Sequence, residues 1–281
     1  EAGADLVYIG GEVFSEQGEE WNTGSIKAFI ACARTSGKQV GIATPRIATE
    51  RELWEFERLF QSLSGQPIDS VLVTNLGTLR LARKHFPDQV VADFNLNILN
   101  TGSLKLMKRL KVQRITPAAE TSLEQALALS RQQILPVELF VHGPVLGAVL
   151  EHCVPAANIS HTPSNGNCPM PCRNKKYALK DNQAHLYPLM IDQYCRNHLM
   201  LPFDVCLLPV LWRALEANVS VVRVEGQYYE TPLIKHVVGL YRREIDRIAE
   251  RKELSPLAGS DYDNLIAISP RPFGMGAYAR G

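Results

Sequence analysis

Short apolar runs alternate with longer amphipathic stretches along most of this chain, and this rhythm limits the folds open to it. The apolar runs lie at residues 6–9, 40–43, 70–73, 90–93, 114–116, 138–141 and 221–224. Most are continuously apolar, as expected of parallel strands that are covered on both faces. The periodicity of amphipathic helices is found between them, at residues 49–62, 77–85, 101–109, 122–132 and 207–217. The repeated strand-then-helix order predicts right-handed crossovers and an α/β fold.

The number of predicted strands indicates a barrel-like arrangement. Seven runs are one fewer than the eight strands of a closed (β/α)₈ barrel, and 281 residues suit one such barrel. Glu1–Asp5 is typical of a helix end that leads into a strand, which suggests the hypothesis that a first strand lies upstream. We therefore expect a TIM-like (β/α) barrel over residues 1–230. Residues 231–281 are expected to form a C-terminal helical extension and tail.

The charge balance excludes several classes of protein. The chain has 30 Lys and Arg residues against 29 Asp and Glu residues, which gives a net charge of +1. Non-specific DNA binding needs an excess of basic residues, so no DNA partner is expected. No apolar run reaches the roughly 18 residues that cross a bilayer, and the start lacks the pattern of a secretory signal. We expect a soluble, cytoplasmic protein without a membrane partner.

Six cysteines are the unusual feature of the composition: Cys32, Cys153, Cys168, Cys172, Cys195 and Cys206. Disulfide frameworks belong to small secreted domains that lack a core, whereas this chain is long enough to bury one. Five of the six lie in the segment 144–206, which is predicted to be a long loop because it contains turn residues and no long periodic element. A loop of this length is usually functional, and in a barrel it lies on the face that builds active sites. The clustering favours a metal or redox site.

The spacing of the cysteines favours an iron–sulfur cluster over zinc. Thiolates are soft ligands that select either one. A structural zinc site usually has two tight pairs of ligands, whereas only Cys168 and Cys172 form such a pair in this sequence. Widely spread ligands, here Cys153 and Cys206, suit a cluster held in a loop. Zinc, or a loop of unmetallated thiols, is the alternative that spacing leaves open.

Six segments spread over the chain carry a resemblance to one known family: Ala2–Gly10, Glu138–Gly143, Asn165–Tyr177, Phe203–Leu208, Val222–Gly226 and Tyr278–Gly281. In the same order, they resemble the signature segments of the peptidase U32 family, which is named for a reported collagenase-like protease activity. The resemblance implies a barrel-like fold with a 4Fe-4S cluster. It also implies oxygen-independent hydroxylation of a ubiquinone precursor or of a base in transfer or ribosomal RNA, with prephenate as a supplier.

Residue by residue, the resemblance assigns four cysteines as ligands of the metal cluster: Cys153, Cys168, Cys172 and Cys206. Cys195 has no counterpart in the family pattern and is the second choice as fourth ligand. Cys32 lies in a helical pattern and is expected to be a small core residue.

The chain also departs from the family pattern. Leu146 and Phe14 stand where other members have cysteines. Ala119 and Gln227 replace arginines, and Glu151-His152 replaces a Gly-Arg pair, so three anion-binding guanidinium groups are missing. The departures indicate a different substrate from that of the best-known members, or one half of a two-protein unit with a paralogous partner.

Three residues near strand ends are the candidates for catalysis: His142, Glu138 and Glu225. Active sites of barrels form where strands end, and a carboxylate there suits a general base. A histidine bonded to backbone and carboxylates paired with arginine are the structural alternatives. Glu120 is a weaker candidate of the same kind.

Two further polar groups are candidates for substrate binding. Asp93, Asn95 and Asn97 occupy alternate positions, so they are expected to share one face of an extended segment that binds a sugar or base, or that forms a hydrogen-bonded barrel layer. Arg173–Lys176 is a basic run that either contacts RNA or forms a solvated loop.

Taken together, the sequence predicts an iron–sulfur enzyme that hydroxylates an RNA base or a small aromatic precursor. A collagenase-like peptidase is the alternative, although no Gly-x-Ser-x-Gly or His-Glu-x-x-His motif is present. A second alternative is a non-catalytic subunit that binds the cluster while a paralogous partner performs the chemistry.

Overall fold

A parallel sheet occupies the first half of the chain in the computed structural model, which describes residues 2–14, 21–160, 168–173, 175–251 and 260–280. Its strands, in spatial order, are β1 (Leu6–Gly10), β2 (Gln39–Ala43), β3 (Ser70–Val73), β4 (Val90–Ala92) and β5 (Arg114–Ile115). Its connecting helices are α1 (Thr23–Thr35), α2 (Glu50–Leu63), α3 (Leu76–His85) and α4 (Thr101–Arg109). All neighbouring strands are parallel, which confirms the α/β fold predicted from the apolar runs.

Side-chain caps define where these helices begin. Each of the first five long helices starts with a capping box, at Asn22, Thr49, Asn75, Asn100 and Ser122. In each box the cap side chain accepts from a backbone N–H of the first turn, and a side chain of that turn accepts from the cap's own N–H. Each cap lies in the connection that follows a strand, so it determines where that connection ends and the crossover helix begins.

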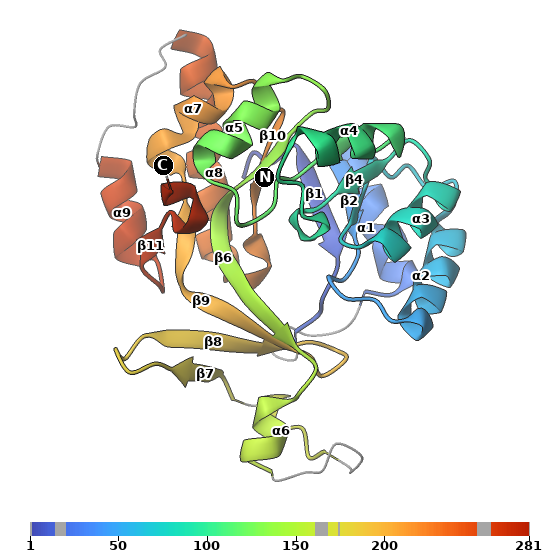
Figure 1. The fold of residues 1–281 in the computed structure, drawn as a ribbon, viewed down its shortest axis with the longest axis vertical. Coiled ribbons are helices and arrows are strands. Elements are labelled where there is room, and N and C mark those ends of the chain that lie inside the picture. The colour runs from blue at the N-terminus through green and yellow to red at the C-terminus, as the bar shows by residue number, and fades with distance from the viewer. Residues whose placement is uncertain (1, 15–20, 161–167, 174, 252–259, 281) are drawn as a thin grey trace.

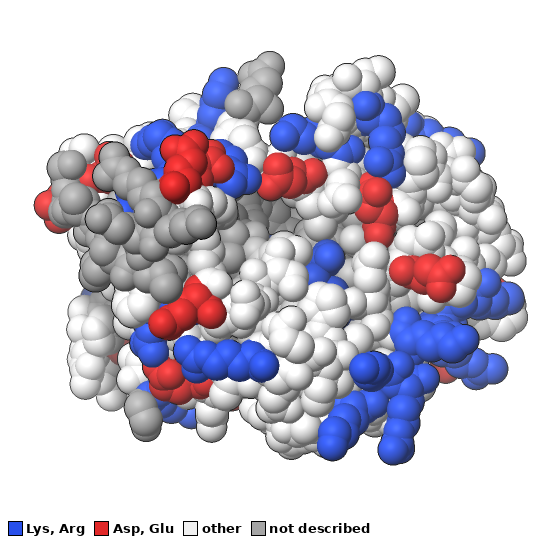
Figure 2. Space-filling view, turned by 90° about the horizontal axis from the view of Figure 1, so that it is seen from above, with Lys and Arg blue, Asp and Glu red and all other residues white. Residues whose placement is uncertain are grey.

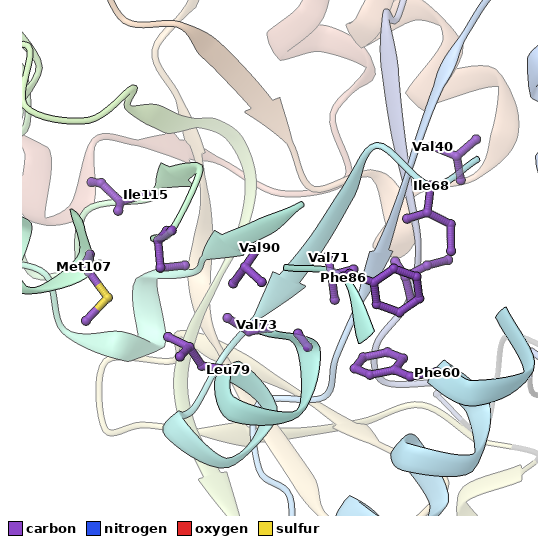
Figure 3. Packing of buried hydrophobic residues seen from close by; sticks show 14 of the residues in the cluster. Val40, Phe60, Ile68, Val71, Val73, Leu79, Phe86, Val90, Met107 and Ile115 are labelled. Atoms are coloured by element: carbon purple, nitrogen blue, oxygen red, sulfur yellow. The ribbon is translucent and has the colours of Figure 1, made fainter. Parts of the chain in front are cut away.

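The first hydrophobic core lies between the parallel sheet and its helices. Figure 3 shows Val71, Val73 and Val90 of the sheet facing Phe60 of α2 and Leu79 of α3. All five are buried, and burial of each large apolar side chain contributes roughly 1.5–3 kcal/mol. This core fixes the positions of the strand ends, and those ends carry the polar residues described below.

The second sheet mixes parallel and antiparallel pairs. Its strands, in spatial order, are β10 (Val221–Val224), β6 (Glu138–Leu150), β9 (Asn197–Cys206), β8 (Leu186–Ile191) and β7 (Tyr177–Lys180), with β11 (Phe273–Gly274) also pairing with β9. Only β10–β6 and β11–β9 are parallel. Figure 1 shows β6 and β9 leaving the body of the molecule together, with β7, β8 and α6 (Val154–Asn158) at their far end. We call this projection, residues 144–202, the β-arm.

The β-arm corrects the prediction of a long loop at 144–206. Much of that segment is strand, and residues 161–167 and 174 lie outside the described part of the chain. The arm was missed because the apolar runs of its strands β6 and β8 contain Gly or Pro, which are more typical of turns and strand edges than of a regular strand. Pro144, Pro188 and Pro202 further interrupt the pattern inside these strands.

A second core joins the β-arm's base to the C-terminal helices. It contains Leu139 and Val141 of β6, Leu211 of α7 (Leu211–Glu216), and Leu240 and Tyr241 of α8 (Thr231–Arg251). The remaining helices are α5 (Leu123–Arg131) and α9 (Ser260–Ile268). The expected C-terminal helices are thus present, and α8 packs on the same core as β6. In the described ranges, no helix has the length and apolar character of a membrane span.

Two isolated bridges in the described part of the chain connect the two sheets or the segments that follow their strands: Ile115, the last residue of β5, pairs with Val137 just before β6, and Phe14 pairs with Asp192 just after β8. Among the strands that the structure describes, no pairing connects β10 with β1, so no closed ring is seen. The α/β class is therefore confirmed, whereas closure into a TIM-like barrel stays a prediction.

Cys32 corrects another expectation, because its side chain is exposed and does not belong to the core. The buried stripe of α1 consists of Ile26, Ile30 and Ala33. Cys32 is one residue away from Ala33, and a step of one residue turns a helix by about 100°, which takes the thiol off this stripe.

Candidate functional site

A network of buried charged groups lies between the two sheets. Arg223 of β10 donates from Nη2 to Asp93 Oδ1 at 2.8 Å and from Nη1 to Glu138 Oε1 at 3.0 Å. The other Glu138 oxygen, Oε2, accepts from Arg114 Nε at 2.9 Å and from Tyr8 Oη at 3.0 Å. Glu138 is completely buried, and both of its carboxylate oxygens accept hydrogen bonds from residues of neighbouring strands. This is the arginine-paired alternative considered for Glu138, and its catalytic role stays a prediction.

Glu225 extends the network toward the outside of the molecule. Its Oε1 lies 3.1 Å from Arg223 Nε, and its Oε2 accepts from Gln227 Nε2 at 3.4 Å. Burial raises the pKa of Glu225, although the neighbouring guanidinium groups of Arg223 and Arg46 oppose this rise. A carboxyl with a raised pKa can hold a proton more readily than an ordinary glutamate, which suits an acid or base.

A second buried ion pair lies next to Glu225. Arg46 donates from Nη1 to Glu12 Oε2 at 2.7 Å, and both side chains are nearly inaccessible. The guanidinium groups of Arg46 and Arg223 each lie over the Phe94 ring, with 5.6 and 5.5 Å to its centroid. Phe94 therefore packs against the two cations of the network, an arrangement that stabilises their positions.

His142 is separate from this network. Its ring is buried among Tyr229, Tyr241 and Phe273, with centroid distances of 5.4–5.8 Å, and its Nδ1 lies 3.4 Å from Tyr241 Oη. Burial lowers the pKa of His142 to about 4, so the ring is neutral at pH 7. Strand alternation alone would place His142 on the same face as Glu138, four residues earlier. A register shift in the pairing with β10, which skips Val141 of β6, breaks the alternation.

The expected shared face of Asp93, Asn95 and Asn97 does not form. Residues Phe94–Leu96 make a 3₁₀ turn, η1, and Asn97 has a left-handed φ of 54° and an exposed side chain. The alternation rule applies only to extended backbone, so the turn sends the three side chains in different directions. Only Asp93 joins the buried network, through Arg223. Glu120 is exposed.

The six cysteines lie in three different places. Cys153 caps α6, and Cys172 lies in the 3₁₀ turn η2 (Pro171–Arg173), which contacts α6. Cys168 is near them in the chain, and its Sγ accepts from the N–H of Met170 at 3.4 Å. Cys195 is in the turn between β8 and β9, at the far end of the β-arm. Cys32 is on α1, and Cys206 is at the other end of β9.

The structure therefore does not bring together the four predicted ligands. Cys206 pairs with His142 at the base of the β-arm, and its buried Sγ lies 3.8 Å from Tyr241 Oη. Cys195 instead interacts electrostatically with the other three: burial, then the thiols of Cys153, Cys172 and Cys168, raise the pKa of Cys195. Within the described ranges, no three His, Cys, Asp or Glu side chains converge on one metal-sized point.

A basic, tyrosine-lined groove begins next to Cys172. It has a volume of about 890 Å³ and runs between the β-arm and the 3₁₀ turn η4 (Gly226–Tyr228). Its charged lining consists of Arg173, Lys175, Lys176, Arg271 and Glu230, and its aromatic lining of Tyr177, Tyr228 and Tyr229. Arg271 is paired with the buried Asp204, and the other three cations outnumber the one carboxylate of the lining, so this groove is positive in a chain whose net charge is nearly zero.

Basic residues also gather on a second surface. Figure 2 shows Lys and Arg side chains massed at one side of the molecule, the side on which α3 and α4 lie in Figure 1. The exposed basic residues of α3, of α4 and of the turn after α4 are Arg80, Lys84, Lys105, Lys108, Arg109 and Lys111. The near-neutral net charge of the chain thus hides two positive regions.

Sequence reasoning missed several residues that the structure places at these sites. Tyr8, Glu12 and Arg46 belong to no sequence motif, because their bonding partners lie far away in the sequence. Cys195 was not missed but was only the second choice as fourth ligand, although the two apolar runs that flank Asp192–Asn197 are the pattern of a hairpin with a cysteine at its tip.

Comparison with known proteins gives one family. Residues 1–280 match the model of peptidase family U32. The chain is 26% identical over 252 residues to the 23S rRNA 5-hydroxycytidine synthase of Escherichia coli (strain K12), covering 89% of this chain and 37% of that protein. It is 26% identical over 255 residues to tRNA hydroxylation protein P of Helicobacter pylori (strain J99), covering 87% and 60%. It is 20% identical over 291 residues to the Collagenase of Porphyromonas gingivalis (strain W83), covering 99% and 69%.

Proposed function

Because this chain belongs to peptidase family U32, we propose that it takes part in the hydroxylation of an RNA base, with an iron–sulfur cluster bound at the tip of the β-arm. Two relatives whose names state hydroxylation of ribosomal or transfer RNA support the reaction class, although the chain spans only 37% and 60% of their lengths. The observation that carries the proposal is the groove that begins at Arg173, one residue after Cys172.

The lining of the groove suits a segment of single-stranded RNA. Proteins bind such segments by combining cations that follow the phosphates with aromatic rings on which bases stack. Arg173, Lys175 and Lys176 supply the cations, and Tyr177 and Tyr229 supply aromatic rings. Tyr228 adds a third aromatic ring to this lining. A base held here would lie beside the cysteine centre.

The thiols at the arm tip fit a multi-iron cluster better than a single zinc ion. Zinc needs all its ligand atoms within about 2.3 Å of one point, whereas the irons of a cubane each take a separate thiolate. Cys153 and Cys172 come from α6 and η2, two segments that contact each other, so these ligands are spread over separate segments. The N–H that donates to Cys168 Sγ is of the kind that tunes a cluster.

Cys153, Cys168 and Cys172 would hold this cluster together with a fourth thiolate. Hydroxylation replaces a C–H bond of the base by C–OH, so it needs an oxygen-atom donor, which is a small organic co-substrate in the oxygen-independent reaction proposed. When bound, the cluster supplies electron transfer or activates that co-substrate. Glu225, with its raised pKa, is the proposed proton acceptor, and Glu138 holds Arg223 in place beside it.

Peptide hydrolysis is the weaker candidate on this geometry. Cys206 and His142 pair directly across β9 and β6 and would be the cysteine and histidine of a thiol peptidase. Both are buried, and burial raises the pKa of the thiol and lowers that of the imidazole. An activated pair needs a thiolate and an imidazolium, which these shifts disfavour.

Nucleoside analysis of RNA tests the proposal. RNA from cells that lack the gene is digested and compared by mass spectrometry with RNA from the parent cells. We expect one nucleoside to lose the mass of one oxygen atom, and the intact gene to restore it. A Cys168→Ser/Cys172→Ser variant should fail to restore it, whereas a variant at the exposed Cys32, Cys32→Ser, should succeed.

Two other outcomes would replace the proposal. If no nucleoside differs, and metal-free protein cleaves gelatin, the chain is a peptidase. If the purified chain is inactive alone but becomes active with a co-purifying family member, it is a subunit whose partner performs the chemistry.

A further inference from the structure

We propose that Cys195, and not Cys206, supplies the fourth thiolate of the centre formed by Cys153, Cys168 and Cys172. The inference rests on the proposed function only in assuming that this centre binds a metal. The position of the fourth thiolate follows from the backbone of the β-arm, whichever metal is bound.

The register of β6 and β9 brings Cys195 to Cys153. Leu150, the last residue of β6, pairs with Asn197, the first residue of β9. Cys153 follows Leu150 by three residues, and Cys195 precedes Asn197 by two. Both cysteines therefore leave the same end of the same strand pair.

Asn197 fastens the two cysteine segments to each other. Its Oδ1 accepts from the N–H of Val154 at 2.9 Å, next to Cys153, and its Nδ2 donates to the carbonyl of Cys195 at 3.1 Å. The side chain is completely buried, so the acceptor and a donor of this amide serve to hold these two segments. A buried amide used in this way positions backbone, and thus the adjacent thiols.

Arg196 makes a second connection between the same two segments. It donates from Nε to Glu151 Oε1 at 2.7 Å, two residues before Cys153, and from Nη2 to Glu52 Oε1 at 2.7 Å on α2. The guanidinium is nearly inaccessible, as is Glu52. The turn with Cys195 is thereby held against both the start of α6 and the body of the molecule.

The turn itself is built to present Cys195. This residue has a left-handed φ of 62°, which residues with a Cβ seldom adopt unless their surroundings impose it. Asp192 imposes it: its Oδ1 accepts from the N–H groups of Tyr194 and Arg196 at 2.9 Å, and its Oδ2 lies 2.9 Å from His198 Nε2. The Cys195 side chain is exposed in this turn and is accessible to a metal.

Cys206 is excluded by distance. It lies nine residues along β9 from Asn197, which is about 30 Å at roughly 3.3 Å per residue. Its thiol belongs to the second core, beside Tyr241. To become a ligand, Cys206 would have to leave this core, and β9 would have to separate from β6.

Metal loading of single variants tests the assignment. The full chain and its Cys195→Ser, Cys206→Ser and Cys32→Ser variants are reconstituted anaerobically with ferrous iron and sulfide. We expect about four irons per chain in the unaltered protein, as for a cubane. Cys206→Ser and Cys32→Ser should keep this content and the visible absorbance, whereas Cys195→Ser should lose at least one iron per chain and change the electron paramagnetic resonance spectrum of the reduced cluster.

The assignment is overturned if Cys206→Ser loses iron while Cys195→Ser keeps it, or if both variants behave alike. Circular dichroism establishes that each variant is folded, and Cys206→Ala serves if the serine variant is not. Loading with zinc chloride separates this inference from the proposed function. If the unaltered protein binds zinc but no iron, and Cys195→Ser alone lowers the zinc content, the cluster fails and the assignment of Cys195 stands.

Discussion

Arg223 of β10 and Asp93 at the end of β4 are joined across the interior of the molecule, with 2.8 Å between Nη2 and Oδ1. Each side chain is 6% exposed, so this ion pair is shielded from solvent. It connects strands of the two sheets, as do the bonds from Tyr8 and Arg114 to Glu138. The buried charges thus contribute to how the two sheets are placed.

The first prediction concerns this pair. Arg223→Met leaves Asp93 and Glu138 without their shared cation, and removing one partner of a buried pair costs about 3–5 kcal/mol. We therefore expect the free energy of unfolding in urea to fall by about this amount. Arg51→Met is the matched control, because Arg51 forms an exposed pair with Glu55 on α2 and its loss should change little. Equal stability of the two variants would show that the interior charges do not hold the sheets.

The second prediction uses the buried ring of His142. Burial lowers its pKa to about 4 in the folded protein, against about 6.5 when the chain is unfolded. Between these values the unfolded chain binds more protons, so stability is lost as the pH falls from about 6.5 to 4. From pH 7 to pH 5 this loss amounts to about 2 kcal/mol.

A variant without the titrating group isolates this effect. In urea unfolding at pH 7 and at pH 5, His142→Phe should lose about 2 kcal/mol less than the unaltered protein between the two pH values. All other titrating groups are shared, so their contributions cancel in the comparison. If the two proteins lose stability in parallel, His142 is not buried as the structure shows.

How far the sequence predicts this fold depends on the type of strand. β3 and β4 were predicted because Ser70–Val73 and Val90–Ala92 are buried along their whole length, and such strands are continuously apolar. β7 was not predicted, because three of the four residues of Tyr177–Lys180 are exposed. Nothing in its local composition distinguishes such a strand from a loop, so only its pairing with β8 in the structure identifies it as a strand.

The same distinction applies to the cysteine centre. Cys168 and Cys172 are close in sequence, so their spacing alone indicated a shared ligand role. The partner across the β-arm depends on which residues of β6 and β9 face each other, and a residue pattern does not contain that register. The family resemblance indicated Cys206 as the fourth ligand. The pairing of β6 with β9 instead brings the chain segment of Cys195 to that of Cys153.

The third prediction concerns the groove. Arg173→Gln and Lys175→Gln should each weaken binding of a short single-stranded RNA for all base sequences alike, because phosphate contacts carry no sequence information. The slope of log affinity against log salt should decrease by about 0.7 for each lost phosphate contact. Arg51→Gln, outside the groove, should leave the slope unchanged. Fluorescence anisotropy at several salt concentrations measures both, and equal slopes in all four proteins would contradict RNA binding in the groove.

The last prediction concerns the reactivity of the thiols. Cys206 is buried, and burial raises its pKa, so little thiolate forms and alkylating reagents have no access. Cys32 is exposed on α1. In native, reduced, metal-free protein treated with iodoacetamide, peptide mass spectrometry should find Cys32 modified early and Cys206 unmodified until urea is added. Rapid modification of Cys206 in the folded protein would mean that its thiol becomes accessible without unfolding. Cys206 would then again be a candidate ligand of the cluster.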